Sequence, residues 1–183
     1  MKVALLVSAS LLALGSVPLA SQVPESDYFA VLRSVMEDTR GRLPVGGVGV
    51  DPHVFVMRPT SPPSPPTSHP AGLQRLVSEH GWRSGPFDEM VQCVVLERQG
   101  RSGAISSRRC RLVGVESHIM LGDPGFAGDT ATVLILMAAN IQGLGDSSLT
   151  PEGSSMYVER ARYKLVRSQQ GWRVVERKSL TQT

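Results

Sequence analysis

A chain of 183 residues in which 41% of the residues are hydrophobic and 19% are charged is typical of one globular domain, and this composition excludes intrinsic disorder. The formal net charge is only +3, so we expect no nucleic acid as a partner. No stretch after residue 20 approaches the about 18 consecutive apolar residues of a membrane helix, so we expect no integral membrane segment in the mature protein.

The N-terminus has the pattern of a secretory signal. Lys2 supplies a positive charge, and the mainly apolar run from Val3 to Gly15 that follows it is shorter than a bilayer span. Small residues near Ala20 offer a cleavage site. We therefore expect residues 1–21 to be removed as a signal peptide and the product to be secreted or periplasmic, with residues 22–183 forming a single domain.

The first element expected in the mature chain is a helix over residues 26–40. Its apolar residues recur at helical spacing and form one stripe: Phe29, Leu32, Val35 and Met36. Gly41 can take the left-handed conformation that ends a helix. Shorter helices are predicted over 71–80 and 86–93.

Two segments rich in proline and glycine are expected to stay outside regular structure. Residues 43–50 are predicted to form a loop, and a short strand at 53–57 follows them. Residues 59–70 read PTSPPSPPTSHP, so we expect an exposed, polyproline-like loop that joins neither sheet nor helix. Such a segment can bind a proline-recognition module, but an exported chain favours a solvated spacer.

The second half of the chain is predicted to form an antiparallel sheet. Five segments alternate or run apolar between glycine-containing turns: 94–97, 110–121, 131–139, 156–167 and 172–178. Residues 168–171 are expected to close a terminal hairpin, in which Tyr163, Leu165, Trp172 and Val174 form one apolar set. Residues 133–139, VLILMAA, are apolar on both faces, which indicates a central strand covered on each side. The predicted fold class is therefore α+β, with N-terminal helices packed on a curved antiparallel sheet.

Cys93 and Cys110 are the whole cysteine content of the chain. In an exported protein such a pair favours a disulfide, and closing a loop of this length contributes about 3 kcal/mol in the chain-entropy model. Apolar neighbours leave a second interpretation open, in which two thiols pack unbridged in the core.

Two motifs of the C-terminal part carry a resemblance to a known family. GDTATV at 128–133 and YKLVRSQQGWRVVE at 163–176, placed after early helices, are similar to the nuclear transport factor 2-like superfamily, especially its secreted SnoaL-like members. The resemblance covers mainly residues 128–180. It implies a cone in which sheet and helices enclose a pocket, used by some members as an isomerase, cyclase or dehydratase site and by others only for binding or dimerisation.

Glu116 and His118 form the best candidate for catalysis. A spacing of two on a strand places both on one face, where a carboxylate can orient an imidazole that acts as general base. The alternative, which we favour, is an exposed pair on the solvent face, because Val113, Val115, Ile119 and Leu121 occupy the opposite face. On this phase Glu116 and His118 are not an active site.

Other residue types predict no cofactor. The four histidines are not spaced as metal ligands, and no glycine-rich phosphate loop is present, so we expect neither a metal site nor a cofactor. Tyr157, Tyr163 and Trp172 are candidates for a binding surface or pocket filling. Basic residues gather in the sheet half and can hold an anionic partner such as a polysaccharide, phospholipid or acidic protein, although Glu159 and Glu176 among them favour a mixed solvated face.

The favoured function is non-catalytic binding by an exported domain. Its ligand is expected to be a small apolar molecule or a protein partner, and a homodimer through the open sheet face is plausible because residues 133–139 need cover on both sides. Two alternatives stay open. One is a cofactor-free isomerase, cyclase or dehydratase that uses Glu116 and His118, and the other is an envelope-associated interaction scaffold.

Overall fold

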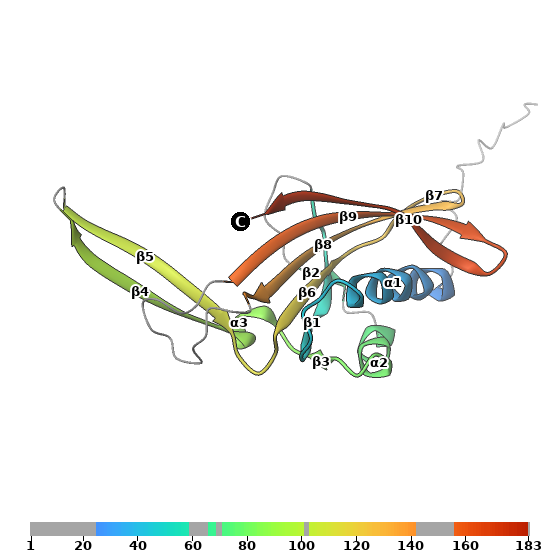
Figure 1. The fold of residues 1–183 in the computed structure, drawn as a ribbon. Coiled ribbons are helices and arrows are strands. Elements are labelled where there is room, and N and C mark those ends of the chain that lie inside the picture. The colour runs from blue at the N-terminus through green and yellow to red at the C-terminus, as the bar shows by residue number, and fades with distance from the viewer. Residues whose placement is uncertain (1–24, 59–65, 69–70, 101–102, 142–155, 183) are drawn as a thin grey trace, which may run out of the picture.

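The computed structural model describes residues 25–58, 66–68, 71–100, 103–141 and 156–182 (Figure 1). The expected signal peptide, residues 1–21, lies outside them. The described residues form an α+β fold, as predicted, with one large sheet and a separate two-stranded hairpin.

The first two helices lie where the sequence predicts them. α1 spans Glu25–Arg40 and α2 spans Ala71–Glu79. α3 spans only Phe87–Met90, because Val91 already has the extended backbone that begins the next strand, so the prediction of a helix over 86–93 is too long. No helix in the described part of the chain is long and apolar enough to cross a membrane.

The strands of the large sheet lie in the order β10-β9-β8-β6-β1-β2, with β3 beside β1 and β7 beside β8. Their bounds are β1 Val48–Phe55, β2 Pro66–Ser68, β3 Arg83–Ser84, β6 Ser117–Gly122, β7 Gly125–Ala127, β8 Thr130–Asn140, β9 Met156–Ser168 and β10 Gly171–Gln182. The hairpin consists of β4 Val91–Gly100 and β5 Gly103–Leu112, and Figure 1 shows it extending away from the large sheet.

The strands of the second half pair antiparallel within the large sheet, as predicted, but strands from the first half make the sheet as a whole mixed. β1 runs parallel to both β6 and β3. Residues 48–50 of β1 also belong to a segment predicted as a loop. Gly49 explains this error: a Cβ atom there would lie 2.6 Å from Sδ of Met90 and 2.9 Å from Cδ2 of His118, so this glycine permits close packing within a strand and marks no turn.

The proline-rich segment also contributes to the sheet. β2 pairs antiparallel with β1, and Pro66 lies opposite Phe55. The prediction that residues 59–70 join no sheet is therefore wrong for 66–68, and the rest of that segment lies outside the described residues. β2 is the outermost strand on its side of the sheet. A proline is tolerated there because an edge strand needs only half of its backbone groups for the ladder.

The segment predicted as one strand over 110–121 is two strands. β5 ends at Leu112 and β6 begins at Ser117. Gly114 between them has a φ of +76°, a backbone conformation that favours glycine, and the chain turns there. Glu116 therefore lies just before β6, and strand alternation does not place it on a common face with His118.

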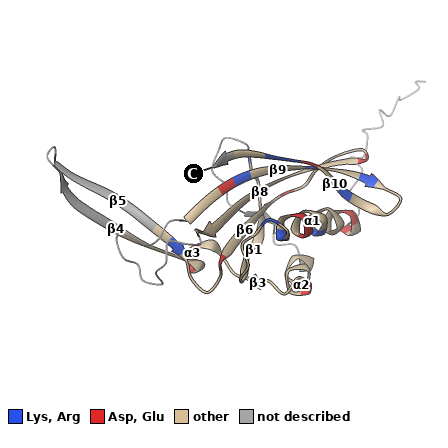
Figure 2. Cartoon of the chain, in the orientation of Figure 1, with Lys and Arg blue, Asp and Glu red and all other residues tan. Residues whose placement is uncertain are grey.

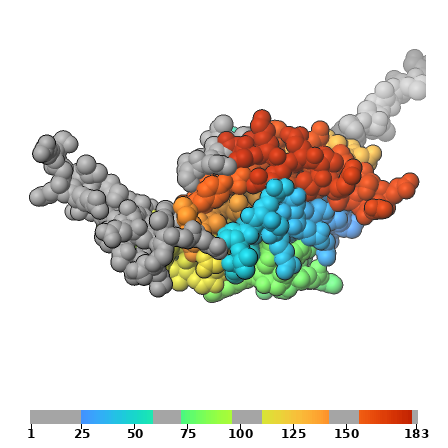
Figure 3. Space-filling model, viewed as in Figure 1, coloured from blue at the N-terminus to red at the C-terminus, as the bar shows by residue number. Residues whose placement is uncertain are grey.

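α1 and α2 pack on one face of the sheet, which we call the helix face, and the opposite side is the outer face (Figure 1). The core on the helix face is apolar and includes Leu32, Val35 and Met36 of α1, Leu73 and Leu76 of α2, and Val133, Ile135, Tyr163 and Leu165 of the sheet. In the space-filling view α1 lies directly against β10 (Figure 3). Protein side chains thus fill the space between the sheet and the helices.

The C-terminal hairpin is confirmed. β9 and β10 pair antiparallel around a turn in which Gly171 has a φ of +109°. The predicted apolar set is buried or packs against the core: Tyr163, Leu165, Trp172 and Val174. The pairing of β10 with β9 shifts register twice, after Val174 and after Ser179.

β8 is a central strand, as predicted, but its outer face is covered only in part. Leu134 and Leu136 are half-buried on that face. At the end of β8, Ala138 is buried in a second apolar cluster with Met90, Leu112 and Val115. The cover on the outer face therefore comes from α3 and the base of the β4–β5 hairpin.

Candidate functional site

His118 lies in β6 beneath α3. Its side chain is 1% exposed, its Nε2 lies 3.0 Å from the carbonyl oxygen of Gly85, and the ring packs edge-on against Phe87. Burial lowers the pKa of His118, and the hydrogen bond to Gly85 and the negative charge of Asp51 oppose that shift. The expectation that His118 faces solvent is wrong, because α3 and its preceding segment cover the outer face at this point.

Glu116 has a different set of partners. Its Oε2 accepts a hydrogen bond of 3.4 Å from Nδ2 of Asn140, and its backbone oxygen accepts one of 2.9 Å from the Asn140 N–H. Glu116 thus joins the turn before β6 to the end of β8. The structure places Glu116 and His118 in separate hydrogen-bonded environments.

The three aromatic candidates belong to the main core. Tyr163 is fully buried, and its hydroxyl lies 3.0 Å from Oγ1 of Thr39. Trp172 is 9% exposed, donates its indole N–H to Asp27 over 3.3 Å, and packs edge-on against Phe126. Tyr157 is half-buried and packs against the same cluster.

An ion pair on the helix face escaped the sequence analysis. Arg177 of β10 lies 2.6 Å from Glu159 of β9, and the two side chains are 17% and 5% exposed. Nε of Arg177 also donates to the hydroxyl of Tyr163 over 3.1 Å. Burial raises the pKa of Tyr163, and its hydrogen bonds with Thr39 and Arg177 offset part of that shift. Glu159 itself was the sequence signal for this buried ion pair, because strand alternation places its carboxylate on the same face as the apolar residues Ala161 and Tyr163.

A second pairing lies in β1. The carboxylate of Asp51 is buried, and its Oδ1 accepts the backbone N–H of His53 over 3.0 Å and lies 3.2 Å from His53 Nδ1. The register of β1 against β6 shifts between Val50 and Val54, so Asp51 and His53 occupy this irregularity. These contacts hold an interrupted strand in shape, which is a common cause of a buried aspartate.

Three arginines of the large sheet have acidic partners. Arg177 pairs with Glu159, Arg162 lies 3.8 Å from Glu176, and Arg167 pairs with Asp27 of α1. Figure 2 shows acidic and basic residues interspersed along α1 and β9. The pair of Arg162 and Glu176 is exposed, as a mixed solvated face requires, whereas Arg177 and Glu159 are largely buried on the helix face.

Two open hollows lie on the described surface. A groove of about 270 Å³ lies between α1 and α2, with Phe29 and Leu76 in its lining and the ion pair of Arg33 and Glu79 at 2.7 Å. Another, of about 380 Å³, lies at the β9–β10 turn. Neither is lined by a predicted site residue. In the described residues no three His, Cys, Asp or Glu side chains are grouped as a metal site requires.

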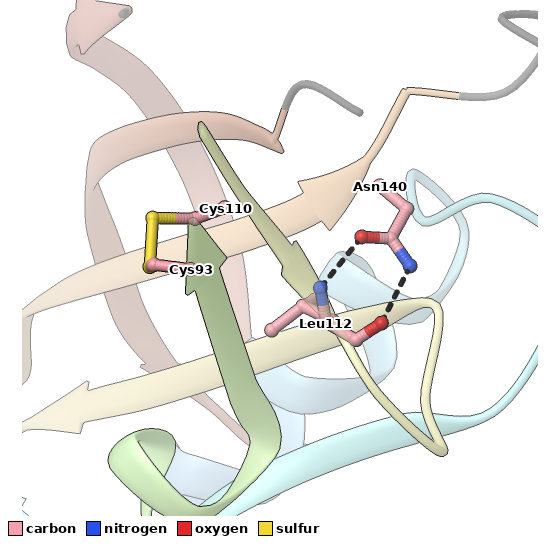
Figure 4. Close-up of a disulfide and its surroundings, with 4 residues drawn as sticks. All are labelled: Cys93, Cys110, Leu112 and Asn140. Atoms are coloured by element: carbon pink, nitrogen blue, oxygen red, sulfur yellow. Dashed lines mark hydrogen bonds between the residues drawn. A yellow bond between two sulfur atoms is a disulfide. The ribbon is translucent and has the colours of Figure 1, made fainter. Parts of the chain in front are cut away.

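The β4–β5 hairpin is fixed at its base. Cys93 and Cys110 lie opposite each other and form the predicted disulfide, with their Cα atoms 4.1 Å apart. Two residues nearer the large sheet, the Asn140 side chain accepts a hydrogen bond of 2.8 Å from the N–H of Leu112 and donates one of 3.2 Å to its carbonyl oxygen (Figure 4). An asparagine thus makes the two bonds that a neighbouring strand would make.

Comparisons with protein-family models, with curated proteins and with solved structures found no match for this chain.

Proposed function

We propose that this chain is an exported domain that binds a protein partner and performs no catalysis. The proposal includes loss of residues 1–21, a secreted or periplasmic location, and a cone-like arrangement of the nuclear transport factor 2-like type. The Cys93–Cys110 disulfide supports export, because disulfides persist in oxidising compartments.

The observation that carries the proposal is the filled helix face. A cone that binds a small apolar ligand or a substrate needs room between its sheet and its helices. Here Ile135, Tyr163 and Leu165 pack against α1 side chains such as Leu32 and Met36. This packing favours an interaction domain that uses its outer surfaces over a domain that encloses a small molecule.

The contacts of the predicted catalytic pair point the same way. His118 donates its Nε2–H to the Gly85 carbonyl oxygen, and Glu116 accepts from Asn140. Each side chain thereby fixes a neighbouring segment. These contacts favour a structural role for both residues over an isomerase, cyclase or dehydratase that would use them for proton transfer.

A homodimer is the simplest protein assembly that the outer face offers. Leu134 and Leu136 on β8 are half-buried there, and Met120 of β6 lies opposite Leu136. A second copy packed on this patch would give the central strand the cover that its sequence predicts. In solution we expect Leu136→Arg to shift the dimer to monomer in sedimentation velocity, with Val175→Arg at an exposed site on β10 as the control.

Native mass spectrometry of the protein purified from the secreted or periplasmic fraction tests the function. We expect the mature chain to carry a second polypeptide, either another copy or a different protein, and to release it under denaturing conditions. A stoichiometric small molecule in place of a polypeptide would contradict the proposal and support ligand binding. Turnover of an isomerase-type substrate that His118→Gln abolishes would support the enzyme alternative.

A further inference from the structure

The β4–β5 hairpin, which we call the arm (residues 91–112), is a two-stranded ribbon. β4 and β5 pair in one continuous register from Val91–Leu112 to Gly100–Gly103. Within the described residues no third strand joins them. A two-stranded ribbon in water is only marginally stable, and its outer edges present a row of backbone donors and acceptors to any further strand.

The structure fixes which backbone groups of β5 point away from β4. The N–H of Leu112 donates to the Asn140 side chain, and the carbonyl of Leu112 accepts from it. The N–H of the next residue, Val113, donates to the carbonyl of Met90 across the hairpin. Alternation then turns the N–H and carbonyl groups of Cys110, Arg108 and Ser106 to the same outer edge as those of Leu112. Asn140 therefore occupies the first position of a row that continues along β5.

The base of the arm holds this edge in place. The disulfide joins β4 to β5 two residues beyond Leu112, and Leu112 itself is buried with Met90, Val115 and Ala138. A partner strand would thus meet an edge that is already extended and joined to the core. Preorganisation of this kind lowers the entropy that binding costs.

The charge of the arm selects the partner. Residues 91–112 contain five arginines and one glutamate, a net charge of +4, whereas the whole chain has +3, so the remainder carries −1. All the basic residues of the arm are arginines, and guanidinium groups match carboxylates in a bidentate geometry.

Two other occupants fit the arm less well. A second copy of the arm would set +4 against +4, which like-charge repulsion disfavours. A membrane surface attracts basic segments, but residues 91–112 contain no Phe, Tyr or Trp, and the tip sequence QGRSGA offers no apolar residue larger than alanine for insertion. An acidic polypeptide uses both the charge and the edge.

We infer that the outer edge of β5, beginning beside Asn140, binds an extended acidic segment of a partner protein as a third strand of the arm. This inference rests on the proposed function and names the partner class and the element that receives it. Backbone hydrogen bonds supply strand addition, and arginines select acidic side chains on the added strand.

Four probes test the inference on the mature protein with its disulfide intact. They are an alternating Glu-Val peptide, the same peptide with every amide N-methylated, an alternating Lys-Val peptide, and phosphatidylglycerol vesicles. We expect only the unmodified Glu-Val peptide to bind, with at least about tenfold weaker binding by the N-methylated and Lys-Val peptides, and amide exchange to slow at Ser106, Arg108 and Cys110. Vesicle binding without peptide binding, or equal binding of the N-methylated peptide, would overturn the inference.

Two proline variants distinguish the edges of the arm. Ser106→Pro removes an outward N–H from β5, and Val95→Pro removes one from β4, and neither residue donates a hydrogen bond between the two strands. We expect Ser106→Pro alone to weaken the Glu-Val peptide by about tenfold or more. Equal loss in both variants, or no loss in Ser106→Pro, would contradict strand addition at β5. Retention of the disulfide and of the near-ultraviolet spectrum shows that each variant is folded.

A charge-reversal variant tests the choice of partner. Arg108→Glu combined with Arg109→Glu should lose the Glu-Val peptide and gain the Lys-Val peptide. If the natural partner found by native mass spectrometry stays bound to Ser106→Pro and to the charge-reversal variant, the arm inference is wrong and the proposed binding function stands. If the Glu-Val peptide binds β5 but the purified protein carries no polypeptide, the arm inference stands and the proposed function loses its support.

Discussion

Asn140 at the end of β8 pairs with Leu112 at the end of β5 through both functional groups of its side-chain amide, at 2.8 and 3.2 Å. Leu112 is only 3% exposed, so its backbone groups depend on this partner. We expect Asn140→Ala to lower the free energy of unfolding by about 1 to 3 kcal/mol, because it leaves a buried donor and acceptor unpaired. Urea denaturation measures this loss, and hydrogen exchange should speed up at the Leu112 amide.

Thr132→Ala is the matched control for Asn140→Ala, since Thr132 is exposed on the same strand. It should change stability by less than about 0.5 kcal/mol. Equal effects of the two substitutions would show that the amide of Asn140 does not anchor the arm.

Trp172 joins the terminal hairpin to α1 and β7. Its ring is buried against Phe126, and its indole N–H reaches Asp27. Trp172→Ala should therefore destabilise the protein by about 3 to 5 kcal/mol in urea denaturation, the range for removing a buried aromatic ring. Val175→Ala, at a site 46% exposed on the same strand, is the control. A loss below about 1 kcal/mol for Trp172→Ala would mean that this side chain is not a core anchor.

His118 makes the fold sensitive to acid. Its pKa is lowered from an ordinary value of 6.5 by burial, so the unfolded chain takes up this proton at a higher pH than the folded one. The stabilising contribution is present above about pH 6.5 and is lost as the pH falls below it, at no more than about 1.4 kcal/mol per pH unit for one proton.

Denaturation curves between pH 7.5 and pH 5 check this expectation. The free energy of unfolding of the natural protein should fall across that interval more steeply than that of His118→Gln, which keeps a donor for the Gly85 carbonyl. Parallel pH dependence in the two proteins would exclude His118 as the source.

The Glu159–Arg177 pair provides the fourth prediction. Arg177→Met leaves the carboxylate of Glu159 buried without its partner and should cost about 3 to 5 kcal/mol. The double variant Glu159→Leu with Arg177→Met removes both charges, so it should recover most of that loss. If the double variant is as unstable as the single one, the two side chains are not energetically coupled.

Regular spacing within one segment made α1 and the terminal hairpin predictable. The stripe from Phe29 to Met36 predicts α1 almost to its ends, and the alternation around Gly171 predicts the terminal hairpin. The disulfide followed from the number of cysteines and the expected compartment. Each of these features depends on residues that are neighbours in sequence, where periods of 3.6 and 2 apply.

The errors have a different origin, because they depend on what a residue meets from elsewhere in the chain. Gly49 is a strand residue since Met90 and His118 approach it, and Pro66 joins the sheet since β2 lies at an edge. His118 is buried because α3 covers it. The candidate site was less predictable than the fold, since the partner of Glu159 is Arg177 in another strand and a single sequence does not report that distance.

The two register shifts in β10 bear on how this protein behaves when concentrated. β10 is the outermost strand on its side of the large sheet and is twelve residues long. A regular edge strand of this length can pair with the edge strand of another sheet. The shifts after Val174 and Ser179 break the even spacing that such polymerisation requires. β5 keeps an even spacing along its whole length. Edge-to-edge growth into fibres is thus discouraged at β10, while the outer edge of β5 stays regular enough to pair with a single added strand.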